Sequence, residues 1–365
     1  MNLSATKILV RIGLVILSIT IGCGICEILS RIIHKIDLPY FINFDGKRET
    51  FNLNVANNEL GHSTKPNFDG WIVGPEFKNR IQTNRQGFRG QQDFLEMKKG
   101  RLRIMALGDS FTFGVGVEEN EVYIKRAADI LQKELSIPVE AINLGVPSYG
   151  TIQEFILFQK YKYLKPDLLV LGLFARDSFS ELDGNDLVDN YRFFYEHIKG
   201  KVVQNEHYTS FMRRVRLFLI KSSNLFRYTE LYFGWYVRKM SSPEKQNLER
   251  KKEAWKITSD YLLKFDTELQ HLKIKCFLLW IPFPLTAVRQ DHSVANNIAA
   301  LRLMNIILID PLEAMKSNPM NYYYTKFDQH WNPKGHNLAA GLLAQKIIES
   351  GIICKTDDST TRNKP

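Results

Sequence analysis

The sequence predicts an α/β protein, a three-layer sandwich in which helices cover both faces of a central parallel sheet. Two observations predict this class. After residue 100, short apolar runs alternate with longer stretches of helical periodicity, the pattern of parallel strands joined by helices. Several of these apolar runs end in glycine or in short polar residues, where such a sheet places its functional sites. An apolar N-terminal helix and a helical insertion are expected as additions.

Composition narrows the class of protein. Of 365 residues, 44% are hydrophobic and 24% are charged, which excludes bulk disorder, collagen and a polytopic membrane protein. Four cysteines are too few for a disulfide scaffold. Cys23 and Cys26 are spaced like a redox pair, but they lie in the apolar N-terminal stretch, so we interpret them as small apolar residues of a helix. The formal charge of +10 first suggests nucleic acid or an anionic surface as a partner.

The N-terminal stretch 12–29 is apolar except for Glu27, and its 18 residues reach the lower limit for crossing a bilayer. We interpret it as an uncleaved membrane anchor, because no small-residue cleavage site follows it. A cleaved signal peptide and a buried amphipathic helix are the alternatives. Basic residues flank both ends of the stretch, so the positive-inside rule leaves its orientation open.

The remaining elements follow in chain order. Residues 37–98 contain frequent Gly, Asn and Pro and predict turns and short strands. Buried strands are predicted at 102–107, 139–144, 167–174, 275–281 and 306–309. Helices are predicted at 121–134, 153–163, 243–272 and 333–350. The sequence is therefore divided into an anchor (1–36), a pre-domain extension (37–98), an α/β domain (99–355) and a polar tail (356–365).

Residues 187–246 interrupt the α/β pattern with a basic and aromatic insertion. It holds 11 basic against 5 acidic residues and, with the anchor flanks, carries nearly all of the excess charge. Phe211, Val215, Phe218 and Leu219 recur at helical spacing, which favours a helical insertion with one buried face. The alternative is a surface that contacts membrane or nucleic acid. We expect an anionic membrane or an acidic glycan as its neighbour, and no nucleic acid.

The first chemical motif, Gly108-Asp109-Ser110, directly follows a predicted strand. A serine at a strand–helix turn presents its hydroxyl at the edge of the sheet, and helix N-terminal N–H groups there stabilise a developing oxyanion. The Gly-x-Ser-x-Gly elbow and the phosphate-binding Gly-Lys-Ser/Thr loop are both absent. The alternative is a plain turn in which Asp109 or Ser110 caps a helix.

The second motif lies near the C-terminus. Asp328 precedes His330 by two residues, and Asn332-Pro333 marks a helix start. An aspartate beside a histidine can supply a general base and the acid that orients it. Metal binding by Asp328, His330 and His336 is the alternative.

Together these motifs resemble the SGNH/GDSL hydrolase family over residues 100–350, which implies a flavodoxin-like parallel sheet. The resemblance implies that Ser110 is the nucleophile, Asp328 the acid and His330 the base. It also implies that Asn143-Leu144-Gly145 is the second block, whose Gly145 N–H serves the oxyanion hole with the N–H of Ser110. Residues 59–61, 65–67 and 83–90 (ELG, KPN and TNRQGFRG) resemble a segment that precedes the core in anchored, bacterial, extracytoplasmic members.

The sequence departs from the family at its third block, where an asparagine is expected to complete the oxyanion hole. Arg176 stands at that place, and a literal Gly-Asn-Asp with Asn185 follows a few residues later. Three interpretations remain open: Arg176 donates to the oxyanion, Asn185 folds back into the site, or the hole has lost one donor. Losing one donor costs about 10²–10³-fold in rate, so activity is weakened and not abolished.

The function implied is an anchored serine esterase or acylhydrolase that acts on an O-acyl ester, in envelope polysaccharide or lipid, outside the cytoplasm. No metal or organic cofactor is expected. The Asp-x-His-Trp form of residues 328–331 is also similar to polysaccharide O-acetylation proteins, so a transferase is one alternative. A catalytically silent protein of the same fold that binds carbohydrate or scaffolds an assembly is another.

Overall fold

The computed structural model falls into two compact units, and each is described by itself. One comprises Met1–Asp37 and Val203–Leu248, and the other comprises Leu38–Val202 and Glu249–Pro365. The structure describes residues 3–33, 40–43, 48–49, 53–57, 59–73, 76–95, 100–175, 223, 225–226, 244–324 and 328–352. The predicted insertion at 187–246 lies almost wholly outside the described residues, and the predicted boundaries between segments stay a prediction.

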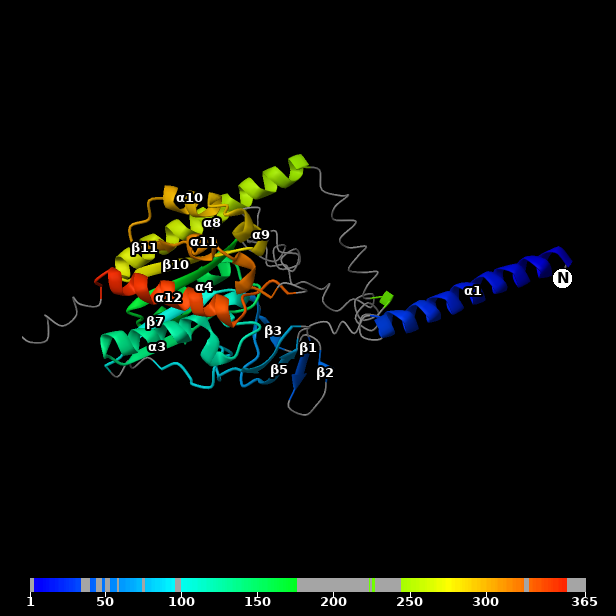
Figure 1. Ribbon diagram of the computed structural model, residues 1–365, viewed down its shortest axis with the longest axis horizontal. Helices are drawn as coiled ribbons and strands as arrows, with labels where there is room; N and C mark the ends of the chain where they lie inside the picture. Colours follow the sequence, from blue (N-terminus) through cyan, green and yellow to red (C-terminus); the bar gives the residue numbers. More distant parts are fainter. Residues whose placement is uncertain are drawn as a thin grey trace, which may run out of the picture. The chain divides into compact units, whose positions relative to one another are not determined.

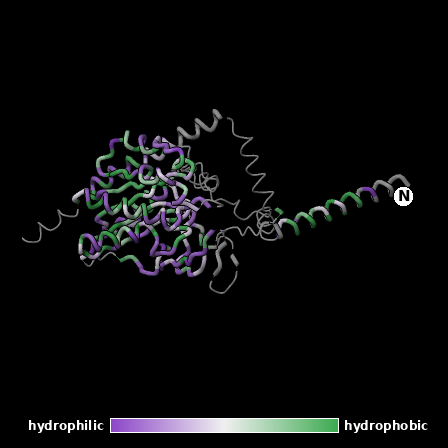
Figure 2. Tube along the Cα trace, in the orientation of Figure 1, coloured by the Kyte–Doolittle hydropathy of each residue, from purple (hydrophilic) through white to green (hydrophobic). Residues whose placement is uncertain are grey.

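The first unit contains helix α1 (Leu3–Ile33). Its stretch Gly13–Arg31 has a mean hydropathy of 2.0 and no buried residues, and Figure 2 shows the hydrophobic colour along it. This helix is long and apolar enough to cross a membrane, a property that signal sequences share. The Glu27 carboxylate pairs with Arg31 Nε (2.7 Å) and accepts a hydrogen bond from Ser223 Oγ (2.8 Å). The carboxylate in the apolar stretch therefore has polar partners.

The second unit is built on a five-stranded sheet with the order β11-β10-β9-β7-β8. Its strands are β7 (Leu102–Gly108), β8 (Val139–Asn143), β9 (Leu168–Ala175), β10 (Lys275–Pro282) and β11 (Ile306–Ile309). All neighbouring pairs are parallel. The central strands are buried on both faces, which is why they read as continuous apolar runs in the sequence. The five predicted strands are confirmed.

Helices cover both faces of this sheet. Helices α3 (Tyr123–Leu135) and α12 (Pro333–Glu349) pack against each other on one face. Helices α4 (Thr151–Tyr161) and α8 (Glu244–Leu272) pack on the other, where the rings of Phe158 and Phe265 lie 5.7 Å apart. The predicted fold class, a three-layer α/β sandwich, is confirmed (Figure 1). The strand order reverses between β7 and β9, and in such sheets this is where ligands bind.

The described residues between positions 40 and 95, which we call the N-terminal segment, form two small antiparallel sheets. The first has the order β2-β1-β5-β6, from β1 (Tyr40–Asn43), β2 (Arg48–Glu49), β5 (Asp69–Val73) and β6 (Lys78–Gln82). The second pairs β3 (Asn54–Asn57) with β4 (Gly61–Thr64). The first sheet shares a hydrophobic cluster with residues of the α/β unit, because Ile72, Phe77 and Ile81 pack with Phe113 and Tyr324.

Several short helices were not predicted. They are α9 (Pro284–Arg289), α10 (Ser293–Ala300) and α11 (Leu312–Met315), with 3₁₀ turns at Glu119–Glu121, Lys162–Leu164 and Pro319–Tyr322. Stretches this short offer too few residues for a hydrophobic period to be recognised. The helix start expected at the Gly108-Asp109-Ser110 turn is that of α2 (Ser110–Phe113). The predicted start of the last helix is confirmed, because Asn332 Oδ1 accepts from the N–H groups of Lys334 (2.9 Å) and Gly335 (3.2 Å).

Candidate active site

Ser110 stands at a sharp turn between the end of β7 and the start of α2. Gly108 makes the turn with φ +154°, and a Cβ there would lie 2.1 Å from Thr112 Oγ1, so only glycine fits. Asp109 caps α2 by accepting a hydrogen bond from Phe111 N (2.9 Å). The N–H of Ser110, as the first residue of α2, has no intrahelical acceptor. Hydroxyl and N–H are thus presented together at the carboxyl edge of the sheet.

The side chain of Asp109 is buried beside this serine. Burial raises the pKa of Asp109 to about 6, against the opposing effects of the Phe111 N–H and the nearby charge of His330. A carboxyl group with this pKa loses its proton just below neutral pH. The turn that carries Ser110 therefore changes charge in the range where a histidine also titrates.

The structure brings Asp328 and His330 to Ser110, although 220 positions separate His330 from the serine. His330 Nε2 lies 2.7 Å from Ser110 Oγ, and His330 Nδ1 lies 2.6 Å from Asp328 Oδ1. A carboxylate only accepts hydrogen bonds, so Nδ1 carries the ring proton and Nε2 accepts from the serine hydroxyl. An imidazole placed in this way can accept the proton of the hydroxyl while the carboxylate orients its ring.

Asp328 is held in its ionised form by its own loop. Burial opposes ionisation, but the His330 ring, the charge of His330 and the His330 N–H outweigh it, and the pKa of Asp328 lies below its ordinary value. Oδ1 also accepts from the backbone N–H groups of Gln329 (2.9 Å) and His330 (2.8 Å). The carboxylate therefore fixes both the loop backbone and the imidazole.

Aromatic side chains pack against the imidazole. The ring centroid of Phe111 lies 4.9 Å from that of His330, 4.8 Å from that of Phe174 and 5.4 Å from that of Trp331. Phe111 and Trp331 are buried, whereas the His330 side chain keeps 25% of its exposure. The imidazole is therefore packed against an aromatic ring while part of its surface stays accessible.

Gly145 follows β8 and approaches α2 closely. A Cβ at Gly145 would lie 2.4 Å from Phe113 N, so a side chain there would displace the helix that begins at Ser110. The N–H of Gly145 donates to Asn143 Oδ1 (2.9 Å), while Asn143 Nδ2 donates to Thr112 O (2.7 Å). The predicted donor thus lies beside the site with its N–H directed at a side chain.

Asn143 is a site residue to which the sequence assigned no role of its own. The buried amide ties α2 to the loop of Gly145, so it sets the distance between two predicted oxyanion donors. Its signal in the sequence was the position directly at the end of a strand, where this fold places its site.

Arg176 and Asn185, the predicted third donors, both lie outside the described residues. His336 is fully buried behind the site, with Nδ1 accepting from Tyr123 N (3.2 Å). Among the described residues, no group of three His, Cys, Asp or Glu side chains is placed to hold a metal ion.

No family model matches the chain, and no curated protein matches it. Among solved structures, the lipase Lip_vut3 from a goat rumen metagenome matches at 17% identity and a TM-score of 0.36, covering 67% of this chain and 96% of the lipase. The acetyl xylan esterase AlAXEase matches at 16% and 0.38, covering 67% of this chain and 99% of the esterase.

A protein from Desulfitobacterium hafniense, described as lipolytic and of the G-D-S-L family, matches at 12% identity and a TM-score of 0.34. The match covers 67% of this chain and 99% of the Desulfitobacterium protein. The family named there is the one that the motifs resemble.

Proposed function

We propose that the chain is a membrane-anchored serine esterase or acylhydrolase that acts on an O-acyl ester through Ser110, His330 and Asp328. The observation that supports it most directly is the pair of hydrogen bonds of His330, 2.7 Å to the Ser110 hydroxyl and 2.6 Å to the Asp328 carboxylate. If Ser110 only capped a helix, it would need neither His330 beside its hydroxyl nor Asp328 beside His330. A nucleophile bonded to a base, with the base bonded to an orienting acid, is the arrangement that supports acyl transfer.

In the proposed reaction, Ser110 Oγ attacks the ester carbonyl while His330 Nε2 takes the hydroxyl proton. Asp328 keeps the imidazole in the reactive tautomer and stabilises the imidazolium that forms. When the tetrahedral intermediate collapses, His330 returns the proton to the leaving alcohol and an acyl-serine remains. Water then repeats the sequence, giving its proton to His330, and releases the carboxylic acid.

The oxyanion is stabilised in this proposal by the N–H groups of Ser110 and Gly145. The Ser110 N–H lies at the positive end of α2, and the Gly145 N–H is shared between Asn143 Oδ1 and the oxyanion. Arg176 or Asn185 is proposed as a third donor on the basis of the sequence alone. Each donor of this kind contributes about 3–4 kcal/mol to the transition state.

We further propose that α1 anchors the protein in a membrane and that the α/β unit works outside the cytoplasm. The exposed apolar stretch Gly13–Arg31 supports the anchor. The extracytoplasmic side follows from the resemblance of the upstream segments. An O-acyl group on an envelope polysaccharide or lipid is the proposed substrate. With a sugar hydroxyl in place of water, the same acyl-serine would give O-acyl transfer.

The test is Ser110-dependent chemistry in the full-length protein held in detergent. Wild type is expected to hydrolyse p-nitrophenyl acetate and to react covalently with a fluorophosphonate probe, and Ser110→Ala is expected to do neither. Ser259→Ala is the matched control, because this hydroxyl donates to the Lys256 carbonyl within helix α8, at an exposed position. Equal rates and equal labelling of wild type and Ser110→Ala would contradict the proposal and favour a silent binding protein.

To identify the class of the natural ester, the protein is assayed with acetylated xylan, acetylated mannan and phospholipid vesicles as substrates. Release of free acetate or fatty acid identifies hydrolysis, and its suppression by an added oligosaccharide, with acyl-oligosaccharide as product, identifies transfer. Acetylated xylan belongs in the set because one of the matched structures is an acetyl xylan esterase.

A further inference from the structure

Three loops carry the proposed site, and all three are contacted by the N-terminal segment. Residues 110–117 form the nucleophile loop, 145–149 the oxyanion loop, and Tyr324 with 328–330 the acid–base loop. The N-terminal segment lies within the same compact unit as these loops. The proposed reaction assigns it no role, although its contacts fall on the loops whose relative positions determine the reaction.

Arg89 makes the most extensive of these contacts. Its side chain is buried, and its guanidinium donates to Gly114 O (2.8 Å), Val117 O (2.7 Å) and Phe113 O (3.4 Å). Gly114 ends α2 with φ +87°, so the arginine binds the carbonyls at the end of the four-residue helix that begins with Ser110. A cation at this end also interacts favourably with the helix dipole.

Only an arginine can make this set of bonds. The planar guanidinium directs donors along fixed, diverging lines, and a second branch reaches Arg80 O (3.2 Å) in the N-terminal segment itself. A lysine offers a single point of donation and cannot span the same carbonyls. Burial lowers the pKa of Arg89 to about 10, so the group remains charged at neutral pH.

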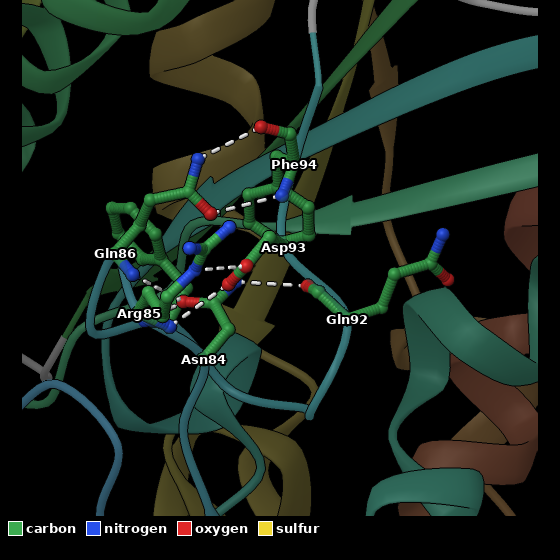
Figure 3. A network of polar contacts seen from close by, with 7 residues as sticks. Asn84, Arg85, Gln86, Gln92, Asp93 and Phe94 are labelled. Atoms are coloured by element: carbon green, nitrogen blue, oxygen red, sulfur yellow. Dashed lines mark hydrogen bonds and ion pairs between the residues drawn. The ribbon is translucent and has the colours of Figure 1, made fainter.

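The loop that carries Arg89 is itself fixed by polar contacts (Figure 3). Gln86 Nε2 donates to Phe94 O (2.8 Å), and Gln86 Oε1 accepts from Phe94 N (2.9 Å). Asn84 Nδ2 donates to Gln92 O (3.0 Å), and Arg85 N donates to Asp93 Oδ1 (2.9 Å). The two sides of the loop are thereby tied together, with Arg89 between them. Because these contacts fix the loop, the backbone of Arg89 also has a fixed position.

Glu76 makes the corresponding contact with the acid–base loop. Its Oε2 accepts from the backbone N–H of Asp328 (3.2 Å). The neighbouring Phe77 ring packs 5.0 Å from the ring of Tyr324. Tyr324 in turn donates its hydroxyl to Gly116 O (2.7 Å) and its N–H to His330 O (2.9 Å). The segment therefore holds the acid–base loop and the nucleophile loop through one connected set of contacts.

His62 completes the set at the oxyanion loop. Its Nε2 lies 2.8 Å from Pro147 O, and its backbone carbonyl accepts from Tyr149 Oη (2.6 Å). A carbonyl oxygen only accepts, so Nε2 carries the proton in this contact. The oxyanion loop is thus bonded to the N-terminal segment at two of its residues.

We propose that Arg89 and Glu76 are positioning residues of the reaction, which fix the positions of Ser110 and Asp328 through their contacts with the backbone. This inference rests on the proposed function. Neither side chain touches the reacting atoms. Arg89 sets the position of α2, Glu76 sets the backbone of Asp328, and the Ser110–His330 distance depends on both. The N-terminal segment is on this view a working part of the active site.

The test compares kcat, KM and stability in the full-length protein. Arg89→Lys is expected to lower kcat about 10²-fold with KM unchanged, because a displacement of about 1 Å at the reacting groups has this effect. Arg80→Lys is the matched control, because Arg80 pairs with Asp69 (2.7 Å) in the same segment with both side chains well exposed. That control is expected to keep kcat within about twofold.

Glu76 supplies an independent variant that does not disturb the core. Glu76→Ala is expected to lower kcat about tenfold with KM unchanged, and Glu76→Gln to restore most of it, because the amide oxygen still accepts from Asp328 N. Glu59→Ala, which removes an exposed carboxylate of the same segment, is the matched control. Unchanged kcat in both Arg89→Lys and Glu76→Ala would overturn the proposal, and so would a failure of Glu76→Gln to restore activity.

A spectroscopic measurement separates this proposal from the proposed function. The proton between His330 Nδ1 and Asp328 gives a downfield proton resonance, assigned by its loss in His330→Gln. Arg89→Lys and Glu76→Ala are expected to shift it, and both controls to leave it in place. If wild type shows no Ser110-dependent turnover, the proposed function fails, and the resonance still decides: a shift supports positioning, and an unmoved resonance overturns it.

Discussion

Two histidine–aspartate pairs lie at the carboxyl edge of the parallel sheet, and they differ in what surrounds them. His330 Nδ1 lies 2.6 Å from Asp328, and His292 Nδ1 lies at the same 2.6 Å from Asp310. The first pair keeps 25% and 12% of its side-chain exposure, and the second keeps 41% and 23%. Pair geometry alone therefore does not distinguish a site from a surface contact.

The difference lies in the third partner and in the role of the carboxylate. His330 directs its other nitrogen at the Ser110 hydroxyl, whereas among the described residues no hydroxyl bonds the other nitrogen of His292. Asp310 instead uses its second oxygen to accept from Leu312 N (3.0 Å) near the start of α11. The first pair reaches the hydroxyl that we propose as the nucleophile, and the second lies between the starts of two helices.

Substitution of each histidine gives the largest expected difference in kcat between the two pairs. His330→Gln should lower kcat about 10³–10⁴-fold, because the general base is lost and the hydroxyl stays protonated. His292→Gln should leave kcat within about twofold. Turnover of p-nitrophenyl acetate by the full-length proteins measures both. A large loss in His292→Gln would mean that the second pair also takes part in the reaction.

Exchange of each aspartate gives the next contrast. Asp328→Asn keeps the shape but presents an amide to His330, favouring the wrong tautomer, so kcat should fall about 10³-fold. Asp310→Asn should leave kcat unchanged and lower the free energy of unfolding by less than about 1 kcal/mol, because its pair is partly exposed. Urea unfolding and kcat for both variants check this. Comparable kcat values for the two would remove the distinction between the pairs.

Asn143 tests the surroundings of the first pair with a smaller expected effect. Asn143→Ala removes the partners of Thr112 O and Gly145 N, two buried backbone groups. We expect a loss of about 1–3 kcal/mol in the free energy of unfolding and about tenfold in kcat, since α2 and the oxyanion loop are no longer tied. Asn305→Ala is the comparison variant. Asn305 directly precedes the amino end of β11, at the edge of the sheet opposite to the site, so this substitution should leave kcat unchanged. Unaltered kcat in Asn143→Ala would show that the tie is not needed.

Much of the fold and the residues of the first pair could be predicted from the sequence, and the reasons are physical. The strands are apolar runs because both faces of the sheet are buried, and Ser110 follows a strand as this fold requires. Asp328 and His330 were predicted because they lie only two positions apart, so the pair can be recognised in the local sequence. Each of these signals is contained within a few neighbouring residues.

The contacts of the N-terminal segment could not be predicted in this way. Arg89 is one of 49 basic residues, and nothing near it in sequence distinguishes a buried cation from a solvated one. The bond from Asp328 N to Glu76 joins positions 252 apart, and no periodicity records such a pair. The Asn143 contact to Gly145 N was missed because a strand-end asparagine is also common in turns.

A third histidine gives the smallest expected change in turnover and a different kind of evidence. His336 is fully buried, and burial first, then the charge of His330, lowers its pKa to about 3. A base whose folded pKa lies below its unfolded value of 6.5 adds stability that is complete above pH 6.5. That stability is lost as pH falls towards 3, at up to about 1.4 kcal/mol per pH unit.

His336→Asn should therefore flatten the loss of stability between pH 6.5 and 4, while kcat at pH 7 stays within about twofold. The asparagine oxygen can replace Nδ1 as acceptor for Tyr123 N. Asp109 acts in the opposite sense, because its raised pKa of about 6 favours folding as pH falls, so the difference between variant and wild type isolates the histidine. Urea unfolding at several pH values measures it. Parallel stability curves for the two proteins would mean that this imidazole is protonated in the folded state, and that its burial behind the first pair does not keep it neutral.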